Sequence, residues 1–519
     1  GFVHDPDGRT FAGSLVPGTF DVNDQDQVAY ARAFDDGAGG TVVEPYLFLL
    51  EPAYDLLAGS HPLLDVFGSA IPDSEEGAAF DINDAGVVVG QVGGSGFFEG
   101  RAHAWILHPS DAALTVKVLL PLPVPGPDDP PFTWSRAVSI SETAPWTIVV
   151  QTSVLRDCPN TCKEGAGARQ EHVQSYLVTL AADGTAGTPV LLAGDADCEA
   201  AVGAWGVAAD GTVSVGSDRR ITLTPCAEDR PEFCATDESG LRWARGGSPG
   251  DLVDFDGAGP DVRWSIAKDV GLDGLAVGYG VDDNGITSCA SRALLWAPGG
   301  AIDTNLHGVP IDAVDMQAPV PPVGLDDVLR SAASGRNDAP ARTIAGWDDG
   351  LRRGVLWYET TPGSGEWRVM FPGVDGPTYS PGSVIDGSCE RPNSTNALVT
   401  YLYDVNDRQT AVGRAVVADS DIEFDEHLVL LVQHAKVGQD ASSTRPAGRR
   451  QAHRRRRGTR TTIGTAHRRP HAPAHAGSAG APRGASPRSA PPAHAWHHVH
   501  LHRRRHRDAE GRAASAGSR

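Results

Sequence analysis

Closely spaced carboxylate and amide side chains recur along this chain and could bind a cation. The phrase Asp-x-Asn-Asp stands at residues 21–24, 81–84 and 404–407. Calcium prefers such oxygen ligands, and Asp21, Asn23 and Asp26 come nearest to a calcium-binding loop. The loop lacks a Gly at its sixth position and a Glu at its twelfth, so no EF-hand pattern is complete. Asn and Asp also form turns by bonding to their own backbone. We therefore interpret the phrase as a hairpin turn, assign no metal ligand, and keep structural calcium as an alternative.

A serine nucleophile is the second chemistry that a short motif suggests. Gly246-Gly-Ser-Pro-Gly250 has the letters of a nucleophile elbow, which needs a preceding strand and a following helix. Here Pro249 and the neighbouring glycines predict a turn instead. Zinc pairs, phosphate loops and dinucleotide fingerprints do not occur in residues 1–435. Scattered Asp and Glu would permit a glycosidase pair, but the sequence singles out no two of them. No catalytic, cofactor-binding or metal-binding residue is therefore nominated.

Aromatic side chains form a third candidate, because they can stack on sugar rings. Four tryptophans stand at equivalent places in the repeats described below: Trp105, Trp243, Trp296 and Trp357. This regular placement favours packing between repeats, where a large ring buries much apolar area. We expect His103, in the same segment as Trp105, to be a packed or turn-bonding imidazole rather than a base.

All these residues belong to a unit that returns about every sixty to seventy residues. Seven copies can be aligned on the Asn of the phrase, at Asn23, Asn83, Ser141, Ala208, Gly271, Asn337 and Asn406. Each copy reads as a hairpin, in which an alternating strand reaches the turn and a β-branched strand follows. The Gly seven residues after Asn83, Gly90, indicates a bulge or a close backbone approach.

A third strand, which usually ends in an aromatic residue, and a short fourth strand complete the unit. The sequence thus predicts an all-β fold, a β-propeller of about seven four-stranded blades over residues 1–435. A ring could close if residues 1–15 paired with the last blade, around residues 403–432. An open solenoid would show the same repeats and remains an alternative.

Charge divides the chain into two parts. Residues 436–519 contain 19 Lys and Arg against 3 Asp and Glu, which leaves 25 basic and 63 acidic residues in 1–435. The acidic part argues against nucleic acid or anionic lipid as its partner. The basic tail has too little apolar surface to fold, so we expect it to be disordered. We interpret this tail as the translation of an out-of-frame stretch of the gene. Binding to an anionic polymer and loose metal binding are the alternatives.

The cysteines and the hydropathy of the chain give information about the cellular compartment of the protein. Five of the seven cysteines fall between residues 158 and 234, where local disulfides are expected; free thiols or a metal site are the alternatives. No apolar run is long enough for a transmembrane helix. The chain begins at Gly1 without a signal-peptide pattern, which fits either a removed leader or a fragment.

Residues 79–90 followed by His103-Ala-Trp105 resemble the HAF-repeat family of bacterial extracellular proteins. Its units combine an Ala-x-x-Ile-Asn-Asp-x-Gly-x-Val-Val-Gly phrase with a His-Ala-Phe phrase, and here Trp replaces Phe. The resemblance spans most of residues 1–433 and implies export and a propeller-like array of strands. The family supplies no catalytic residues to transfer, and Ser141, Ala208 and Gly271 depart from its pattern.

These observations lead to three functional hypotheses. We favour an exported, monomeric and non-enzymatic β-propeller at the cell surface or outside the cell, which binds an unidentified protein or glycan. Its specificity would lie in inserts on the rigid scaffold, at residues 108–133, 156–172, 217–240, 307–328 and 371–398. A glycan-directed propeller hydrolase with carboxylates at the central channel is the alternative. A calcium-stabilised adhesin is the third possibility.

Overall fold

The structure is a computed structural model of the 519-residue chain. Its contacts divide the chain into two units, residues 1–433 with 496–519 and residues 434–495. Every described residue belongs to the first unit. The described residues are 14–35, 40–93, 100–123, 132–157, 169–192, 200–221, 236–244, 252–254, 262–282, 291–306, 309, 331–348, 353–370, 398–418, 424–433 and 496–498.

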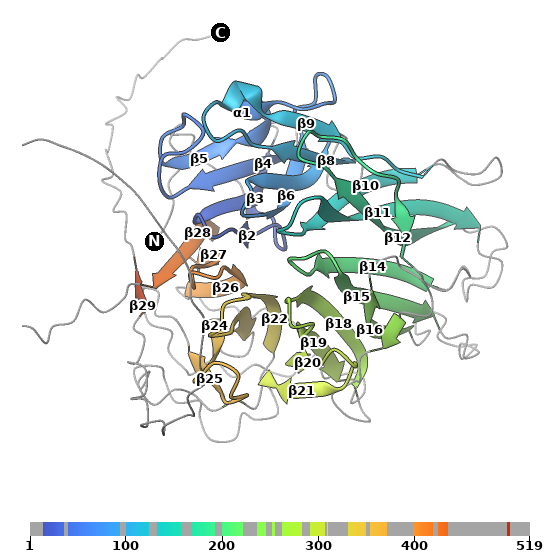
Figure 1. Cartoon of the computed structure of the whole chain (residues 1–519), viewed down its shortest axis with the longest axis vertical. Helices are drawn as coiled ribbons and strands as arrows, with labels where there is room; N and C mark the ends of the chain where they lie inside the picture. Colours follow the sequence, from blue (N-terminus) through green and yellow to red (C-terminus); the bar gives the residue numbers. More distant parts are fainter. Residues whose placement is uncertain are drawn as a thin grey trace, which may run out of the picture. The chain divides into compact units, whose positions relative to one another are not determined.

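The first unit is built of seven antiparallel sheets, each with four main strands, that follow one another in chain order (Figure 1). The first two sheets contain β1 (Ser14–Leu15), β2 (Asp21–Val22), β3 (Gln27–Asp35), β4 (Thr41–Leu49) and β5 (Gly59–Pro62), then β6 (Gly77–Ile82), β7 (Val87–Val92), β8 (Arg101–Ile106) and β9 (Val116–Leu119). The third contains β10 (Phe132–Ile140), β11 (Trp146–Asp157), β12 (Arg169–Leu180) and β13 (Val190–Leu191). Helix α1 (Leu63–Phe67) and the short 3-10 helix η1 (Ala112–Leu114) lie between these strands.

The fourth and fifth sheets are joined by a single parallel bridge between Glu238 and Trp264. They contain β14 (Ala200–Val207), β15 (Val213–Ile221), β16 (Thr236–Ala244) and β17 (Leu252–Asp254), then β18 (Val262–Val270), β19 (Ala276–Asp282), β20 (Ser291–Trp296) and β21 (Ile302–Asn305). The last two contain β22 (Ser331–Arg336), β23 (Thr343–Asp348), β24 (Arg353–Glu359) and β25 (Trp367–Met370), then β26 (Leu398–Val405), β27 (Ala411–Ala418), β28 (Phe424–Gln433) and β29 (Trp496–His498). The predicted all-β class and the seven four-stranded units are thus confirmed.

The Asn of each repeat begins the turn between the first two strands of a sheet, as predicted. The Asn83 side-chain oxygen accepts the Val87 N–H at 2.9 Å, and the Gly86 N–H bonds to the Asn83 carbonyl at 3.0 Å. The fourth residue of the turn has a left-handed backbone, with φ of 57° at Asp26 and 73° at Gly86. Asp and Gly tolerate this geometry, while the phrase itself recurs because its Asn side chain accepts a backbone N–H within the turn.

A bulge follows a fixed pattern on the first strand of six sheets. In the second sheet the pairing with β7 shifts at Phe80, so that Ala79 faces Gly90 and Asp81 faces Val89. A Cβ added at Gly90 would collide with the Ala78 carbonyl oxygen. The equivalent glycines of four other sheets meet the same obstacle: Gly216, Gly278, Gly346 and Gly413. The predicted close backbone approach is therefore confirmed.

Replacing Gly90 by alanine is expected to lower the free energy of unfolding by about 1–3 kcal/mol, because the strands must move apart to admit a methyl group. The backbone of Ala78 cannot yield as a flexible side chain would. Urea unfolding measures the change. Gly363→Ala tests the cost of alanine in a left-handed turn with open space around it, and an equal loss in both variants would contradict the steric reason.

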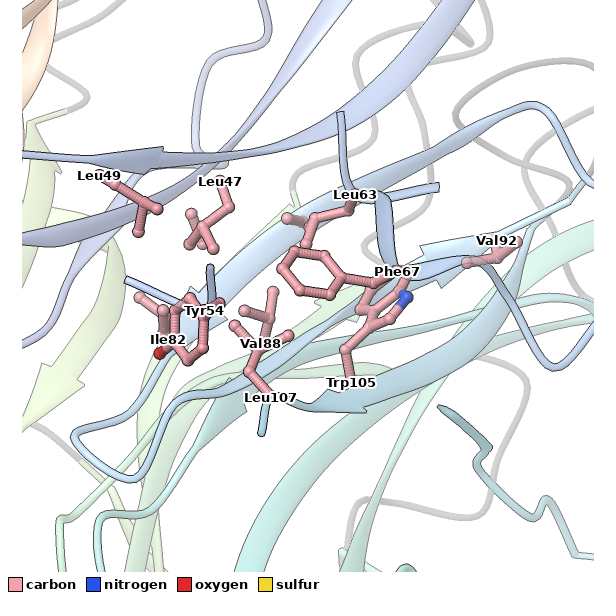
Figure 2. Close-up of a cluster of buried hydrophobic side chains, with 12 residues drawn as sticks. Leu47, Leu49, Tyr54, Leu63, Phe67, Ile82, Val88, Val92, Trp105 and Leu107 are labelled. Atoms are coloured by element: carbon pink, nitrogen blue, oxygen red, sulfur yellow. The ribbon is translucent and has the colours of Figure 1, made fainter. Parts of the chain in front are cut away.

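Apolar side chains fill the spaces between consecutive sheets. Figure 2 shows one such cluster, in which Trp105 lies with Phe67 and Leu63 of α1 between the first two sheets. The Trp105 indole N–H donates to the Gly68 carbonyl at 2.7 Å, and Trp357 makes the same kind of bond to Leu306 at 2.9 Å. Trp105, Trp296 and Trp357 are all buried. The core interpretation of these three residues is confirmed, while the Trp243 side chain lies outside the described part.

His103 is also a packed residue, as predicted. It is fully buried against Trp105, with ring centroids 4.7 Å apart. Burial lowers the pKa of His103 to about 4, so the imidazole is neutral near neutral pH.

The strands at the two ends of the repeats do not pair with one another as the sequence predicted. Strand β1 pairs with β3 of the first sheet, not with the last sheet. The fourth strand of the last sheet is β29, at residues 496–498, which the sequence had placed in the disordered tail. Strands β1 and β2 nevertheless contact β28 and β26. Residues 1–13 and the rest of the tail lie outside the described residues.

Several other expectations fall on residues that the structure does not describe. They include all seven cysteines, the segment Gly246–Gly250, and residues 371–397 of the insert expected at 371–398. Strands β11, β12, β15 and β16 extend into the inserts expected at 156–172 and 217–240, so those inserts are shorter than predicted. Within the described ranges, no helix is long and apolar enough to span a membrane.

Candidate functional site

Four aspartates gather where the first strands of the sheets meet. Each first strand contacts the first strand of the next sheet, and β26 contacts β2 in the same way. Three of these strands carry an aspartate directly after the bulge, Asp81, Asp269 and Asp404, and β2 carries Asp21 at the equivalent position. We call these four residues the first-strand aspartates. Each is surrounded by protein but keeps a partial contact with solvent.

The first-strand aspartates hydrogen-bond to the backbone of neighbouring sheets. The Val22 N–H donates to Asp404 at 3.1 Å, and the Ile82 N–H donates to Asp21 at 2.8 Å. The Ile140 N–H donates to Asp81 at 2.7 Å. In the same register, the Arg336 N–H donates to Asp269 at 2.8 Å and the Val207 N–H to the Ser139 hydroxyl at 3.2 Å. Each of these side chains therefore ties one sheet to another.

Glycine stands at this position in the fourth and sixth sheets because the neighbouring strand takes the space. A Cβ at Gly206 would meet the Lys268 carbonyl oxygen at 2.7 Å, and one at Gly335 would meet the Tyr403 carbonyl oxygen at 2.7 Å. Because Gly206 has no side chain that could accept the Val270 N–H, this N–H donates instead to the side chain of the adjacent Asp269, at 2.7 Å.

Burial raises the pKa of every first-strand aspartate above its ordinary value. Burial raises the pKa of Asp21 well above its usual value, and the charges of Asp81 and Asp404 raise it further. Burial also raises the pKa of Asp404 to about 6 and that of Asp81, although hydrogen bonds to both oppose the shift. Burial and the Asp404 charge raise the pKa of Asp269 to about 7, against the opposing charge of Arg336.

A second set of carboxylates lies on the turns that follow the first strands. We call Asp24, Asp84, Glu142, Asp338 and Asp407 the turn carboxylates. The Asp407 N–H donates to Asp24 at 2.8 Å, the Asp24 N–H to Asp84 at 2.7 Å, and the Asp84 N–H to Glu142 at 2.6 Å. The Asp338 N–H donates to Asp407 at 2.6 Å. These bonds link the sixth, seventh, first, second and third sheets.

Repulsion among the turn carboxylates adds to the effect of partial burial. Burial and the charges of Asp84, Asp81 and Asp24 raise the pKa of Glu142 to about 8, although the Asp84 N–H opposes the shift. Burial likewise raises the pKa of Asp84, with a further rise from Asp24 and Asp407. Glu142 and Asp84 are nevertheless exposed as residues, so water and solutes can reach them.

The turn asparagines form a parallel chain of bonds between sheets. The side-chain N–H of Asn337 donates to the Asn406 carbonyl at 3.3 Å, and that of Asn406 to the Asn23 carbonyl at 2.7 Å. Asn23 donates in turn to the Asn83 carbonyl at 3.1 Å, and Asn83 to the Ser141 carbonyl at 2.9 Å. All four asparagines are buried, which makes each bond costly to lose.

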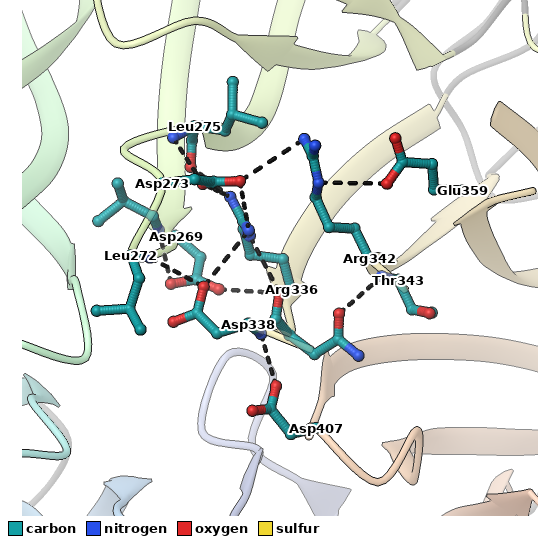
Figure 3. A network of polar contacts seen from close by, with 12 residues as sticks. Asp269, Leu272, Asp273, Leu275, Arg336, Asp338, Arg342, Thr343, Glu359 and Asp407 are labelled. Atoms are coloured by element: carbon teal, nitrogen blue, oxygen red, sulfur yellow. Dashed lines mark hydrogen bonds and ion pairs between the residues drawn. The ribbon is translucent and has the colours of Figure 1, made fainter. Parts of the chain in front are cut away.

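Arg336 takes the place of the missing asparagine in the fifth sheet (Figure 3). A Cβ at Gly271 would collide with the Arg336 guanidinium, so a larger residue there would have to displace Arg336 from its present position. The Arg336 Nε donates to the Asn337 carbonyl at 3.3 Å, which is the bond that an asparagine at 271 would make. Its Nη1 donates to Asp273 at 2.7 Å and to the Leu275 carbonyl at 2.8 Å. The departure at Gly271 is thus compensated from the sixth sheet.

Asp21, Asn23 and Asp26, whose sequence comes nearest to a calcium-binding loop, are hydrogen-bonded to protein groups. Asp21 accepts the Ile82 N–H, and the Asn23 side-chain oxygen accepts the N–H groups of Gln25 and Gln27 at 3.1 and 3.0 Å. Asp26 accepts from the Asn406 side chain at 3.1 Å. Among the described residues, no group of three or more His, Cys, Asp or Glu is arranged to hold a metal ion.

Sequence reasoning named Asp21 only as a calcium candidate and missed the set to which it belongs. Asp269, Glu142 and Arg336 stand in degenerate repeats, where the phrase is hard to see. The position within the repeat would have revealed both sets. Each first-strand aspartate stands two residues before the aligned Asn position, and each turn carboxylate stands one residue after it. Aligning all seven copies on that position would have grouped both sets.

The fold and the site define a class of protein, an all-β array of seven four-stranded sheets joined by turn and first-strand carboxylates. No family model matches this chain, and no curated protein matches it. Among solved structures, it is similar to the catalytic domain of a GH62 α-L-arabinofuranosidase from Coprinopsis cinerea. The TM-score is 0.24 and the identity 8% over 55% of this chain and 90% of that chain, so this likeness carries no argument about function.

Proposed function

We propose that residues 1–435 form a closed, exported and non-enzymatic β-propeller of the HAF-repeat kind, which presents its loops to a protein or glycan ligand. The observation that carries this proposal is the use of the carboxylates. The first-strand aspartates and the turn carboxylates accept backbone N–H groups from neighbouring sheets. Their gathering at one place therefore serves the scaffold, which leaves binding to the loops.

Contacts between the first and last sheets support ring closure. Phe20 stacks on Tyr403 with ring centroids 4.9 Å apart, and both belong to one apolar cluster with Leu15, Val412 and Leu428. A closed ring protects strand edges from pairing with other molecules, which suits a protein outside the cell.

The full-length chain, probed on glycan and protein arrays, tests the binding function. We expect a ligand whose binding is lost when the insert at 371–397 or that at 222–235 is replaced by a short Gly-Ser linker. The matched control shortens the exposed turn at 361–365, which should leave binding unchanged. Binding that survives replacement of every insert would contradict loop recognition.

A glycan-directed hydrolase is the second candidate function, and one observation favours it. Glu142 is exposed and protonated near neutral pH, as a general acid must be, and the charge of Asp84 acts on it. Glycosidases use such a pair of carboxyl groups, one as acid and the other as base or nucleophile.

If the chain is a hydrolase, Glu142→Gln is expected to lower turnover of aryl glycosides by about 10²–10⁴-fold, the usual contribution of general acid catalysis. The wild-type rate should also fall as pH rises through about 8, where Glu142 loses its proton. Glu366→Gln, at an exposed turn, is the matched control. Turnover that is absent in the wild type, or equal in both variants, would dismiss this candidate.

A further inference from the structure

Two cationic side chains meet a tryptophan where the first strands of the third, fourth and fifth sheets lie together. Strand β14 contacts both β10 and β18. The Lys268 Nζ of β18 lies 3.8 Å from a ring centroid of Trp205 in β14, and the Arg136 guanidinium of β10 lies 5.5 Å from a ring centroid of the same indole. All three residues are partly exposed, so a solute can reach them. We call them the Trp205 cluster.

Buried polar contacts hold the Arg136 guanidinium in place. The Gln151 side chain is fully buried, and its oxygen accepts the Arg136 Nε–H at 2.9 Å. Its N–H group donates to the Ala204 carbonyl at 2.6 Å, which joins Arg136 to β14. The guanidinium also lies over the rings of Trp134 and Phe80, 5.1 and 5.7 Å from their centroids. A positive charge that is held in this way loses little freedom when it binds an anion.

Close packing of β14 against β18 places Lys268 beside Trp205. A Cβ at Gly206 would meet the Lys268 carbonyl oxygen at 2.7 Å, so the two strands approach closely at the residue that follows Trp205. Trp205 and Lys268 both occupy the bulge position of their strands. Because a bulge redirects the side chain, the contact between the ammonium and the indole follows from the strand geometry.

The Trp205 indole differs from the buried tryptophans in its N–H group. The Trp105 and Trp357 N–H groups donate to backbone carbonyls. Within the described part of the chain, the Trp205 N–H has no such partner. A Cβ added at Gly203 would lie 3.6 Å from the Trp205 Nε1, which is an ordinary contact. The cluster therefore offers a hydrogen-bond donor with space for a small group beside it.

We propose that the Trp205 cluster binds the carboxylate of an acidic saccharide, such as a uronic acid residue. Arginine and lysine side chains carry several N–H donors, so both can bind a ligand in addition to their protein contacts. Hydrogen bonds between charged groups are about twice as strong as neutral ones. A sugar also offers a hydroxyl oxygen to the Trp205 N–H and an apolar C–H surface to the aromatic ring.

The positive charge of the Trp205 cluster contrasts with the charge of the surrounding body. Residues 1–435 contain 25 basic and 63 acidic residues, which repel an anionic ligand from much of the surface. Two cations around one partly exposed indole give such a ligand a favourable place despite this repulsion. The site rests on the proposed binding function, for which it names the glycan class, although it lies on strands rather than on inserts.

Calorimetric titration of the full-length chain with trigalacturonate, trimannuronate and a hyaluronan tetrasaccharide tests the site. We expect at least one of them to bind, and its methyl ester, which lacks the charge, to bind at least ~10-fold more weakly. Hydrogen exchange locates the ligand on the wild-type chain, where β14 and β18 should exchange more slowly in its presence. Protection confined to residues 436–519 would assign the binding to the basic tail and overturn the site.

Lys268→Met removes the ammonium and keeps an apolar side chain over the indole, so affinity should fall by about 10-fold. Lys117→Met, at a partly exposed position of β9, is the matched control and should bind as the wild type does. Gly203→Val keeps both cations but fills the space beside the indole N–H, so it should also weaken binding. Unchanged affinity in Lys268→Met and Gly203→Val would contradict the site. If Lys268→Met fails to fold, the exchange data on the wild type still decide the question.

Two further results would overturn the acidic-saccharide site. One is that none of the three saccharides binds, or that acid and methyl ester bind equally well. The other is that a hexaglutamate peptide protects β14 and β18 while no saccharide does, which would assign the cluster to acidic peptides.

The site and the loop function can fail separately. An array ligand that needs the insert at 371–397 or at 222–235, but binds equally well to Lys268→Met, would support the loops and reject the Trp205 cluster for that ligand. An acidic saccharide whose binding needs Lys268 and survives replacement of both inserts would support the cluster and reject the loops.

Discussion

Arg336→Met is expected to lower the free energy of unfolding by about 2–3 kcal/mol at pH 7, because it removes a buried guanidinium that donates to two carboxylates and two backbone carbonyls. The Arg336 side chain is 3% exposed and contacts Asp273, Asp338, Leu275 and Asn337. Methionine fills similar space but donates no hydrogen bond. The carbonyls of Leu275 and Asn337 then lose a donor, and the two carboxylates lose their nearest positive charge.

The loss should depend on pH in a defined direction. Burial alone would raise the pKa of Asp273, but the hydrogen bonds and charge of Arg336 lower it below its usual value. A depressed pKa contributes stability above the ordinary value of about 3.8, and that contribution disappears as pH falls through the folded pKa. The difference between wild type and Arg336→Met should therefore shrink below pH ~4.

Urea unfolding at several pH values measures both effects. Arg368→Met, at an exposed position of β25 in the same sheet, is the matched control and should change stability by less than about 0.5 kcal/mol. Arg336→Lys keeps the charge but lacks the planar fork, so we expect it to recover less than half of the loss. A loss below about 1 kcal/mol for Arg336→Met would show that the guanidinium does not replace the missing asparagine.

Asn83→Ala is expected to cost about 2–4 kcal/mol, because it removes two buried hydrogen bonds at once. The side chain is fully buried, and its oxygen holds the Val87 N–H within the turn. Its N–H group donates to the Ser141 carbonyl in the next sheet. After the substitution, both backbone groups remain buried without these partners.

Asn83→Ser separates the bond within the turn from the bond between sheets. The third sheet already has serine at this position, where the Ser141 hydroxyl accepts the Thr147 N–H at 2.8 Å. Serine at position 83 should likewise preserve the turn while losing the bond to Ser141, for a cost of about 1–2 kcal/mol. Urea unfolding compares the two variants, with Asn305→Ala at an exposed strand position as the control. Equal losses for serine and alanine would mean that the bond within the turn contributes nothing.

The repeats made the scaffold predictable from the sequence. The Asn-Asp turn, the following β-branched strand, the Gly and the strand ending in Trp all act over a few residues, so their patterns survive in the sequence. They predicted seven four-stranded sheets, the buried Trp105, Trp296 and Trp357, and the packed His103. Pairing of the chain ends was harder, because a two-residue strand such as β1 carries almost no pattern of its own.

The convergence of the carboxyl groups was decided by tertiary structure. Asp21, Asp81 and Asp404 are far apart in the sequence, and the burial and neighbouring charges that raise the pKa of Asp21 depend on three sheets packing in one register. Arg336 likewise serves the turn at Gly271 from another sheet, which no local pattern reveals. Turn and strand preferences are short-range and are written in adjacent residues. The protonation and pairing of buried charges depend on what distant segments bring near them.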